Sequence, residues 1–492
     1  MNIRKAKETI KDTVRAYLEK DASGKYLFPV TQQRPLLLMG PPGIGKTAIV
    51  EQIAAECGIG LVSYNMTHHT RQSAVGLPHL AERTYDGRTV SVTEYTVSEI
   101  IVSVLDCMQD TSLREGILFI DEINCVSETL APAMLQFLQK KMFGPFRIPE
   151  GWIIVAAGNP RSFNRSAREY DVAVLDRLRK LNIEPDLDAW MAFAMKESVH
   201  GAILSYLTFH RDHFFLVRGE EGAAEYVTAR GWQDLSTLLQ ACERLQIEVD
   251  EELVFPYLTV RGIAKTFSAF YRLYRKCFCD CRSAQMPQTF SGWISSLSAL
   301  AVRADRQEQH ILAGLLLDTL GTELARYRKQ ENLTALAGDR LKKLEAGIHA
   351  PDAASRTEQQ LRKWEEALAI RKQYFLVSAA DADTEEQLLQ ELRLCLQHIR
   401  EEHLSTDAAG IAAYLQAQQT SRIADLETRC SHLQQQMEES LLFIKKYLPE
   451  ETQQAFLMQL TANENAVRFI SAHGCEAYFS LSEKGVKRDG SL

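Results

Sequence analysis

The sequence has no apolar run long enough to cross a membrane, because no window approaches the roughly eighteen uninterrupted apolar residues that a spanning helix needs. The opening segment, MNIRKAKETIKDTVRAYLEK, is a charged amphipathic pattern and lacks the continuous apolar segment of a secretory signal. Internal repeats and low-complexity tracts are also lacking. We therefore predict a soluble, globular, cytoplasmic protein that has no membrane partner.

Cysteine is sparse and scattered, with ten residues in a chain of 492, which favours reduced thiols over a disulfide framework. Three cysteines cluster in CFCDC, at 277–281. On a helix Cys277 and Cys281 share a face while Cys279 points away, which is poor geometry for a tetrahedral metal site. We interpret all three as reduced, partly buried thiols.

An excess of positive charge is lacking too, since the formal net charge is −8. The chain therefore has no global electrostatic attraction to nucleic acid, and we do not expect nucleic acid as a partner. A local basic surface stays open as an alternative.

Up to about Pro185, short apolar runs alternate with helical patterns. The runs are LLLM at 36–39, GLVSYN at 60–65, GILFI at 116–120, WIIVAAG at 152–158 and LNIEP at 181–185. Short apolar strands separated by helices predict an α/β fold, a parallel five-stranded sheet with helices on both faces. Asp86-Gly87 further predicts the turn of a β-hairpin inserted at about 80–95.

Two helices of this region have predicted limits. Thr96 and Glu99 fit a capping box that opens one helix. In the next helix apolar residues recur every four positions until Gly144 ends it, and these residues are Leu130, Met134, Leu138 and Met142.

Strand signals nearly vanish after residue 186. We predict an α/β domain at 1–185, a helical domain at 186–285 and a C-terminal helical, partly coiled-coil accessory region at 286–492. Two stretches in the last region have three-four apolar spacing, namely Leu388, Leu392, Cys395 and Ile399, and Ile423, Leu426, Cys430, Leu433 and Met437. This spacing favours an antiparallel helical hairpin or a short coiled coil.

The segment GPPGIGKT, at 40–47, is a full match to the phosphate-binding loop pattern, and it lies between a predicted strand and a predicted helix. Its glycines let successive N–H groups point at phosphate oxygens, and the following helix adds its positive end. An ordinary Gly/Pro turn is the alternative, and the Lys-Thr pair and the flanks argue against it. The expected nucleotide-binding residues are Gly40, Pro41, Pro42, Gly43, Ile44, Gly45, Lys46, Thr47 and Ala48.

Lys46 would reach the outer phosphates of ATP, and Thr47 would ligate Mg²⁺. In GILFIDE, four apolar residues place Asp121 at the carboxyl end of a strand, where it would also hold Mg²⁺. Glu122 beside it would polarise a water towards the γ-phosphate. A solvated strand end is the alternative for the two acidic residues.

These motifs, together with AAGNP and VLDRLRKLNIEP, make residues 35 to about 240 resemble AAA+ ATPases, most closely those of the MoxR type. The resemblance implies an AAA+ sheet domain that is followed by an α-helical lid. It also implies that Asn159 orients the attacking water and that Arg177 reaches into the site of a neighbouring subunit. Arg230, in VTARGWQDLS, is similar to the sensor-two arginine of the family.

Alternatives stay open for these three residues. Asn159 could be a capped strand end, and either arginine could form a surface ion pair. Other arginines compete with Arg177 for the role in the neighbouring site, namely Arg165, Arg168 and Arg179.

A site completed by a neighbour's arginine implies a ring of this chain with itself, usually a hexamer. The MoxR resemblance implies an ATPase that remodels or activates a protein client, with a von Willebrand factor A-domain protein as partner. The region after about 290 would be the adaptor or client-binding part. The hairpin resembles an insert that faces the central pore. His68, His69 and Arg71, just before it, are either solvated loop residues or substrate contacts.

Three other functions stay open. The acidic charge balance and the lack of a recognisable DNA-binding module argue against a nucleic-acid-remodelling motor. The pore-loop phrase of sigma-factor activators is missing from the insert region. The third alternative is a nucleotide-dependent scaffold with feeble turnover.

Overall fold

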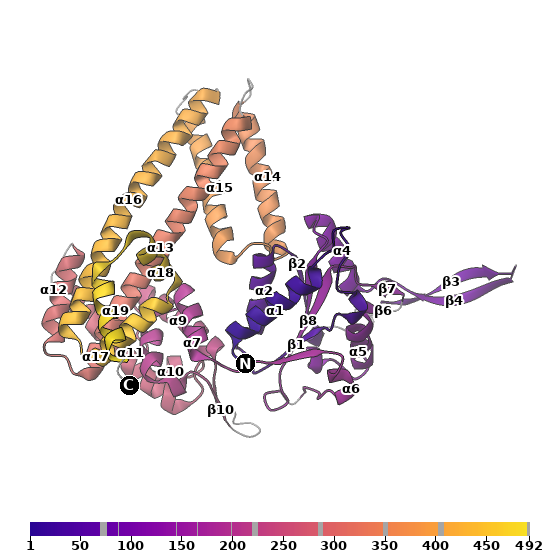
Figure 1. The fold of residues 1–492 in the computed structure, drawn as a ribbon, viewed down its shortest axis with the longest axis horizontal. Helices are drawn as coiled ribbons and strands as arrows, with labels where there is room; N and C mark the ends of the chain where they lie inside the picture. Colours follow the sequence, from indigo (N-terminus) through magenta and orange to yellow (C-terminus); the bar gives the residue numbers. More distant parts are fainter. Residues whose placement is uncertain are drawn as a thin grey trace. The chain divides into compact units, whose positions relative to one another are not determined.

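Five parallel strands form the central sheet of the N-terminal part of the chain (Figure 1). The computed structural model describes residues 1–68, 76–86, 88–143, 145–164, 166–197, 199–218, 225–283, 289–347, 353–401 and 408–489. The strand order is β2-β5-β8-β1-β9. The strands are β1 (Leu36–Met39), β2 (Gly60–Asn65), β5 (Gly116–Asp121), β8 (Trp152–Gly158) and β9 (Arg179–Asn182). This confirms the predicted α/β fold; β5 extends one residue further, to Asp121, and β9 begins earlier than the predicted run.

Helices cover both faces of this sheet, because residues on each strand alternate between two cores. Leu36, Leu38 and Phe119 share one core with α1 (Ile3–Leu18) and α2 (Lys46–Cys57). Leu37, Leu118 and Ile120 share the other with α4 (Glu99–Thr111) and α5 (Ala131–Lys140). Short helices join these elements, namely η1 (Val30–Gln32), η2 (Met66–His68), η3 (Ile123–Cys125) and α6 (Val172–Leu175).

The predicted hairpin is present as β3 (Pro78–Tyr85) and β4 (Arg88–Tyr95), and Figure 1 shows it projecting from the sheet domain. Asp86 lies in its turn with a φ of 48°, while Gly87 lies outside the described residues. Two isolated strands bury little apolar surface, and most of the hairpin's residues are exposed.

Two predicted helix limits were wrong. Ser98, not Thr96, is the N-cap of α4; Thr96 instead closes the base of the hairpin, where its Oγ1 accepts a hydrogen bond from Leu77 N at 2.9 Å. Helix α5 ends at Lys140 because Lys141 takes a left-handed conformation, with a φ of 53°. Met142 therefore lies in β6 (Met142–Phe143), which pairs with β7 (Phe146–Arg147), and Gly144 lies outside the described residues.

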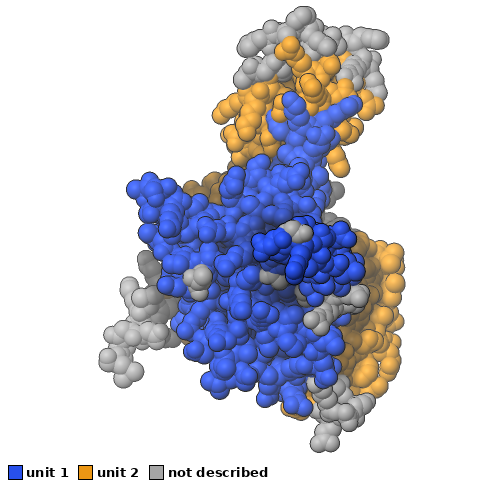
Figure 2. Space-filling view, turned by 90° about the vertical axis from the view of Figure 1, so that its right-hand side faces the viewer, with its two compact units in different colours: residues 1–186, 361–386 blue, residues 187–360, 387–492 orange. Residues whose placement is uncertain are grey.

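The chain divides into two compact units, coloured separately in Figure 2. The first comprises residues 1–186 and also residues 361–386, which are the adjoining ends of two helices far along the chain and the turn between them. Tyr374 in this turn is buried in the same core as α4, and its hydroxyl donates to Asp110 Oδ2 at 2.6 Å. The sequence pattern did not predict this attachment.

The second unit comprises residues 187–360 and 387–492 and is almost entirely helical. One hydrophobic core runs through residues of the predicted helical domain, such as Trp232 and Phe267, and of the accessory region, such as Leu316 and Leu441. The division at 285 stays a prediction. The unit contains α7 (Leu187–Lys196), α8 (Gly201–Phe209), η4 (Arg211–His213), β10 (Leu216–Arg218), β11 (Glu225–Val227), α9 (Ala229–Leu245), α10 (Glu251–Val254), α11 (Arg261–Ser283), α12 (Phe290–Ala301), α13 (Arg306–Gly347), α16 (Ala408–Tyr447), α17 (Glu450–Ala462), α18 (Glu464–His473) and α19 (Glu476–Asp489).

Helices α14 (Ala353–Gln373) and α15 (Ala379–Glu401) each contribute residues to both units. The two stretches with three-four spacing are helical, in α15 and α16, and Arg422 Nη2 of α16 lies 2.7 Å from Glu391 Oε2 of α15. Ile423 is 44% exposed, so this position of the pattern is not buried. A coiled coil stays a prediction.

Several expectations concern cysteines, metals and membranes. The side chains of Cys277, Cys279 and Cys281 lie outside the described residues. The cysteines that the structure does describe are free thiols, and its described residues include no group of three or more metal-ligating side chains. Within the same residues, none of the helices combines the length and the apolar character that crossing a membrane requires.

Candidate nucleotide site

The loop at 40–45 connects the carboxyl end of β1 to the start of α2, and its backbone can be made only with glycine at particular positions. Gly43 and Gly45 have φ angles of 75° and 89°, in the left-handed region that glycine adopts without strain. A side chain at Gly40 would lie 2.6 Å from Ile183 O. Helix α2 therefore begins directly after the loop. The N–H groups of its first turn have no hydrogen-bond partner within the helix, and that turn has no acidic side chain.

Lys46 lies inside this loop with 8% of its surface exposed. Its Nζ donates to Gly40 O at 2.9 Å, Pro41 O at 2.8 Å and Asn159 Oδ1 at 2.9 Å. The positive charge is thus held between the loop and the end of β8. An anion bound by the loop would meet an ammonium group that is already in position.

Thr47 and Asp121 meet at the same edge of the sheet. Thr47 Oγ1 donates to Asp121 Oδ2 at 3.2 Å, although the two residues are 74 positions apart. A hydroxyl and a carboxylate side by side are the hard oxygen donors that Mg²⁺ prefers in nucleotide sites, so the residues present fit this metal.

Glu122 directly follows and has a left-handed backbone, with φ 53° and ψ 36°. Its N–H donates to Asp121 Oδ1 at 2.8 Å, which holds the turn after β5. A non-glycine residue in this region is strained, and such strain is concentrated at functional sites. Burial, and then the negative charges of Glu122 and Asp121, raise the pKa of the Cys125 thiol.

Asn159 follows the last residue of β8, and its side-chain oxygen accepts the hydrogen bond from Lys46. Its backbone oxygen accepts a hydrogen bond at 2.7 Å from the side chain of Asn124, which is 1% exposed. Sequence reasoning missed Asn124. The available signal was a polar residue two positions after the acidic pair, between Ile123 and Cys125.

Arg177 is exposed, and its Nη1 donates to Gln139 Oε1 of α5 at 2.8 Å. It follows α6, whose N-cap Asp171 accepts from Val174 N. Its action in a neighbouring site stays a prediction. Among its competitors, Arg179 donates to Thr13 Oγ1 of α1 at 2.7 Å, Arg168 pairs with Glu128 at 3.2 Å, and Arg165 lies outside the described residues.

Arg230 belongs to the second unit, where it lies exposed in the first turn of α9. Thr228 caps this helix by accepting a hydrogen bond from Gly231 N at 3.2 Å. The role of Arg230 at the nucleotide stays a prediction. Of the residues before the hairpin, His69 and Arg71 lie outside the described residues, as does the side chain of His68.

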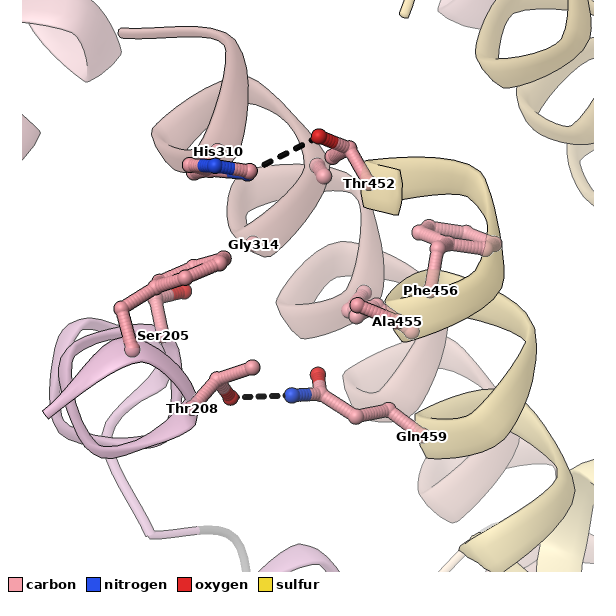
Figure 3. A pocket seen from close by; sticks show the side chains of 11 residues that line it. Ser205, Thr208, His310, Gly314, Thr452, Ala455, Phe456 and Gln459 are labelled. Carbon is pink, nitrogen blue, oxygen red and sulfur yellow. Dashed lines mark hydrogen bonds between the residues drawn. The ribbon is translucent and has the colours of Figure 1, made fainter. Parts of the chain in front are cut away.

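A pocket in the second unit, between α8, α13 and α17, is lined by none of the predicted site residues (Figure 3). Thr452 Oγ1 and His310 Nδ1 lie 2.9 Å apart, and Gln459 donates to Thr208 across it. The ring of His310 stacks on Phe209. Four of the polar side chains that line the pocket are thus paired with one another.

Residues 36–180 match the model of the ATPase family associated with various cellular activities (AAA). Midasin of Giardia intestinalis is 27% identical over 164 residues, which are 32% of this chain and 3% of midasin. The chain therefore spans only a small part of that relative's length. The solved structure of C. elegans PCH-2 is 15% identical, covers 44% of this chain and 50% of that chain, and has a TM-score of 0.25, too low to support an assignment.

The residues that match this family model contain the loop, the acidic pair, Asn159 and Arg177, and their five-stranded parallel sheet with helices on both faces is consistent with the AAA+ fold.

Proposed function

We propose that this chain is a MoxR-type AAA+ ATPase that hydrolyses ATP in a ring of its own copies and uses the energy to remodel or activate a protein client. The observation that carries the proposal is the meeting of Lys46, Thr47, Asp121 and Asn159 at one edge of the sheet. A nucleotide-binding protein that only holds ATP needs the loop; the acidic pair and the asparagine beside it are the additions that hydrolysis requires.

The chain's own groups have separate roles in the proposed reaction. The N–H groups of the loop and of the first turn of α2 bind the phosphates, and Lys46 exchanges the loop carbonyls for phosphate oxygens. Thr47 and Asp121 hold Mg²⁺, which supplies positive charge to the phosphates when bound. Glu122 accepts a proton from the attacking water, and Asn159 orients that water.

The remaining parts of the proposal concern assembly and partners. Arg177 lies exposed on the AAA domain, as a residue offered to a second copy must, and we place it in the site of the neighbouring subunit. We assign Arg230 of α9 to the nucleotide as a lid residue. We further propose a von Willebrand factor A-domain protein as partner, with the accessory helices as its adaptor and the hairpin as a client contact.

Replacement of Glu122 by Gln tests the catalytic part. The variant should bind ATP with an affinity within a few-fold of wild type but release phosphate about 10²- to 10⁴-fold more slowly, since general-base catalysis contributes this much. Isothermal calorimetry and phosphate release measure the two quantities. Wild-type turnover in the variant would reject Glu122 as the base, and full cellular function without turnover would favour a scaffold.

The same variant tests the partner. A ring of Glu122→Gln subunits loaded with ATP should retain bound proteins, because the step that releases them is blocked. Mass spectrometry of the proteins that co-purify from the native host should find one with a von Willebrand factor A domain. Its absence, with other proteins retained in an ATP-dependent way, would contradict this partner but not the ATPase.

A further inference from the structure

We propose that Asn124 is a positioning residue for hydrolysis, which holds Asn159 in register with the acidic pair. The proposal rests on the proposed ATPase function and assigns a residue to the same site. Asn124 lies in η3, two residues after Glu122, and belongs to neither predicted motif.

The first argument is the position at which the pairing of β5 and β8 ends. Strands β5 and β8 are parallel neighbours, and their described register ends at the pair Ile120 and Ala156. Asn159 lies three residues beyond that pair. The side chain of Asn124 replaces the ladder there, because its Nδ2 donates to Asn159 O at 2.7 Å.

The second argument is how closely this side chain fits. Asn124 is 1% exposed, and its Oδ1 lies so close to Gly158 that a Cβ added to the glycine would come within 2.5 Å of it. The amide therefore lies wedged between the end of β8 and the turn after β5. A buried amide in this position restrains Asn159 from one side only, at its backbone oxygen.

The third argument concerns the side-chain nitrogen of Asn159. Lys46 donates to the side-chain oxygen of Asn159, and Asn124 donates to its backbone oxygen. Neither contact uses the side-chain nitrogen of Asn159, which is the group that can donate to a water or a phosphate oxygen. Because catalytic groups must be held to within about 0.5 Å, loss of the Asn124 contact should slow hydrolysis more than it weakens ATP binding.

Other groups of η3 contact the loop that leads to Arg177. Asn124 O accepts from Arg168 N at 2.8 Å, and Cys125 Sγ accepts from Asn164 Nδ2 at 3.2 Å. These bonds anchor the loop that leads to Arg177, and they do not involve the Asn124 side chain. A side-chain substitution at Asn124 should therefore leave a subunit able to lend Arg177.

Asn124→Asp is the test variant, because it keeps the shape and replaces the donor by a carboxylate oxygen facing Asn159 O. We expect its kcat to fall about 10- to 100-fold, as for a misplaced catalytic group, while the Kd for ATP stays within about threefold. Asn124→Ala should show the same split if the aspartate variant folds poorly. Asn463→Asp is the matched control, since it makes the same substitution at a buried asparagine whose side chain caps α18 in the second unit, and its kcat should stay within about twofold.

Mixed assemblies separate positioning from folding. Asn124→Asp subunits mixed with Arg177→Ala subunits should recover activity at the Arg177→Ala sites, because the former still lend the arginine. A wild-type kcat in both Asn124 variants would overturn the inference. Asn124 variants that lose ATP affinity and the ability to supply Arg177, as well as kcat, would also overturn the inference. These losses together would show that Asn124 has a merely structural role. A wild-type protein without ATPase activity would instead overturn the proposed function, and this inference with it.

Discussion

Lys141 is a buried lysine whose replacement by methionine should change how stability depends on pH. It is 4% exposed at the C-cap of α5, and its Nζ donates to Gln33 Oε1 at 2.7 Å. Burial lowers the pKa of Lys141 from its ordinary 10.5 to about 8. Between these two pH values the unfolded chain binds more protons than the folded one, so the free energy of unfolding rises with pH across this window.

The size of the effect follows from the shift. One pKa unit corresponds to about 1.4 kcal/mol, so the full shift, from 10.5 to about 8, corresponds to about 3 kcal/mol. Below pH 8 both states are protonated, and this gain is absent. Between pH 7.5 and 9.5 wild type should gain about 2 kcal/mol relative to Lys141→Met, which cannot titrate. The unpaired Gln33 oxygen in the variant costs about 1 kcal/mol at either pH and cancels in the comparison.

Urea unfolding of both proteins at pH 7.5 and 9.5 measures the difference, because other titrating groups are common to both. Lys140→Met is the matched control, since Lys140 is the exposed last residue of α5 and the direct neighbour of Lys141. Its difference from wild type should not change with pH. A Lys141→Met difference that changes by less than about 0.5 kcal/mol would refute burial of the ammonium at this site.

Three further substitutions have defined outcomes. Gly45→Ala meets no atom within 4 Å but forces alanine to a φ of 89°, so it should cost about 1–2 kcal/mol and weaken ATP binding. Gly262→Ala, also in open space but in helix α11, should instead stabilise the chain by up to about 1 kcal/mol in thermal melts. Tyr374→Phe removes the hydrogen bond to Asp110 and should cost about 1 kcal/mol, measured by urea unfolding, while Tyr85→Phe on the exposed hairpin should cost nothing measurable. Asp121→Asn should weaken the Mg²⁺ dependence of ATP binding without unfolding the chain, and unchanged dependence in a magnesium titration would contradict the assigned ligand.

The sheet and much of the site were predictable because each signal is local. Short apolar runs place the strands, and the loop at 40–47 and the pair Asp121-Glu122 are contiguous in sequence. Parallel strands end at the same edge, so the meeting of Thr47 with Asp121 follows from the order of the elements.

What the sequence did not reveal depends on partners far along the chain or on cap conformations. The role of Asn124 exists only through Asn159, 35 residues away, and the turn at Tyr374 reaches Asp110 across 264 positions. Helix α5 ends because Lys141 takes a left-handed conformation, which glycine usually adopts at this position. The sequence therefore contains no residue type that predicts this helix end. Periodicity indicates which face of a helix is buried, not which element buries it.

The central claim is that ATP bound at one subunit is hydrolysed with an arginine from the next. Lys46→Ala subunits cannot bind ATP but keep Arg177, and Arg177→Ala subunits bind ATP but cannot lend the arginine. Each variant alone should be inactive, by about 10³-fold or more for Arg177→Ala, and their mixture should regain phosphate release at the mixed sites. In the control mixture, Arg168→Ala subunits replace the Arg177→Ala subunits. Their phosphate release should not depend on mixing with Lys46→Ala subunits. No recovery in mixed assemblies of confirmed composition would contradict the shared site.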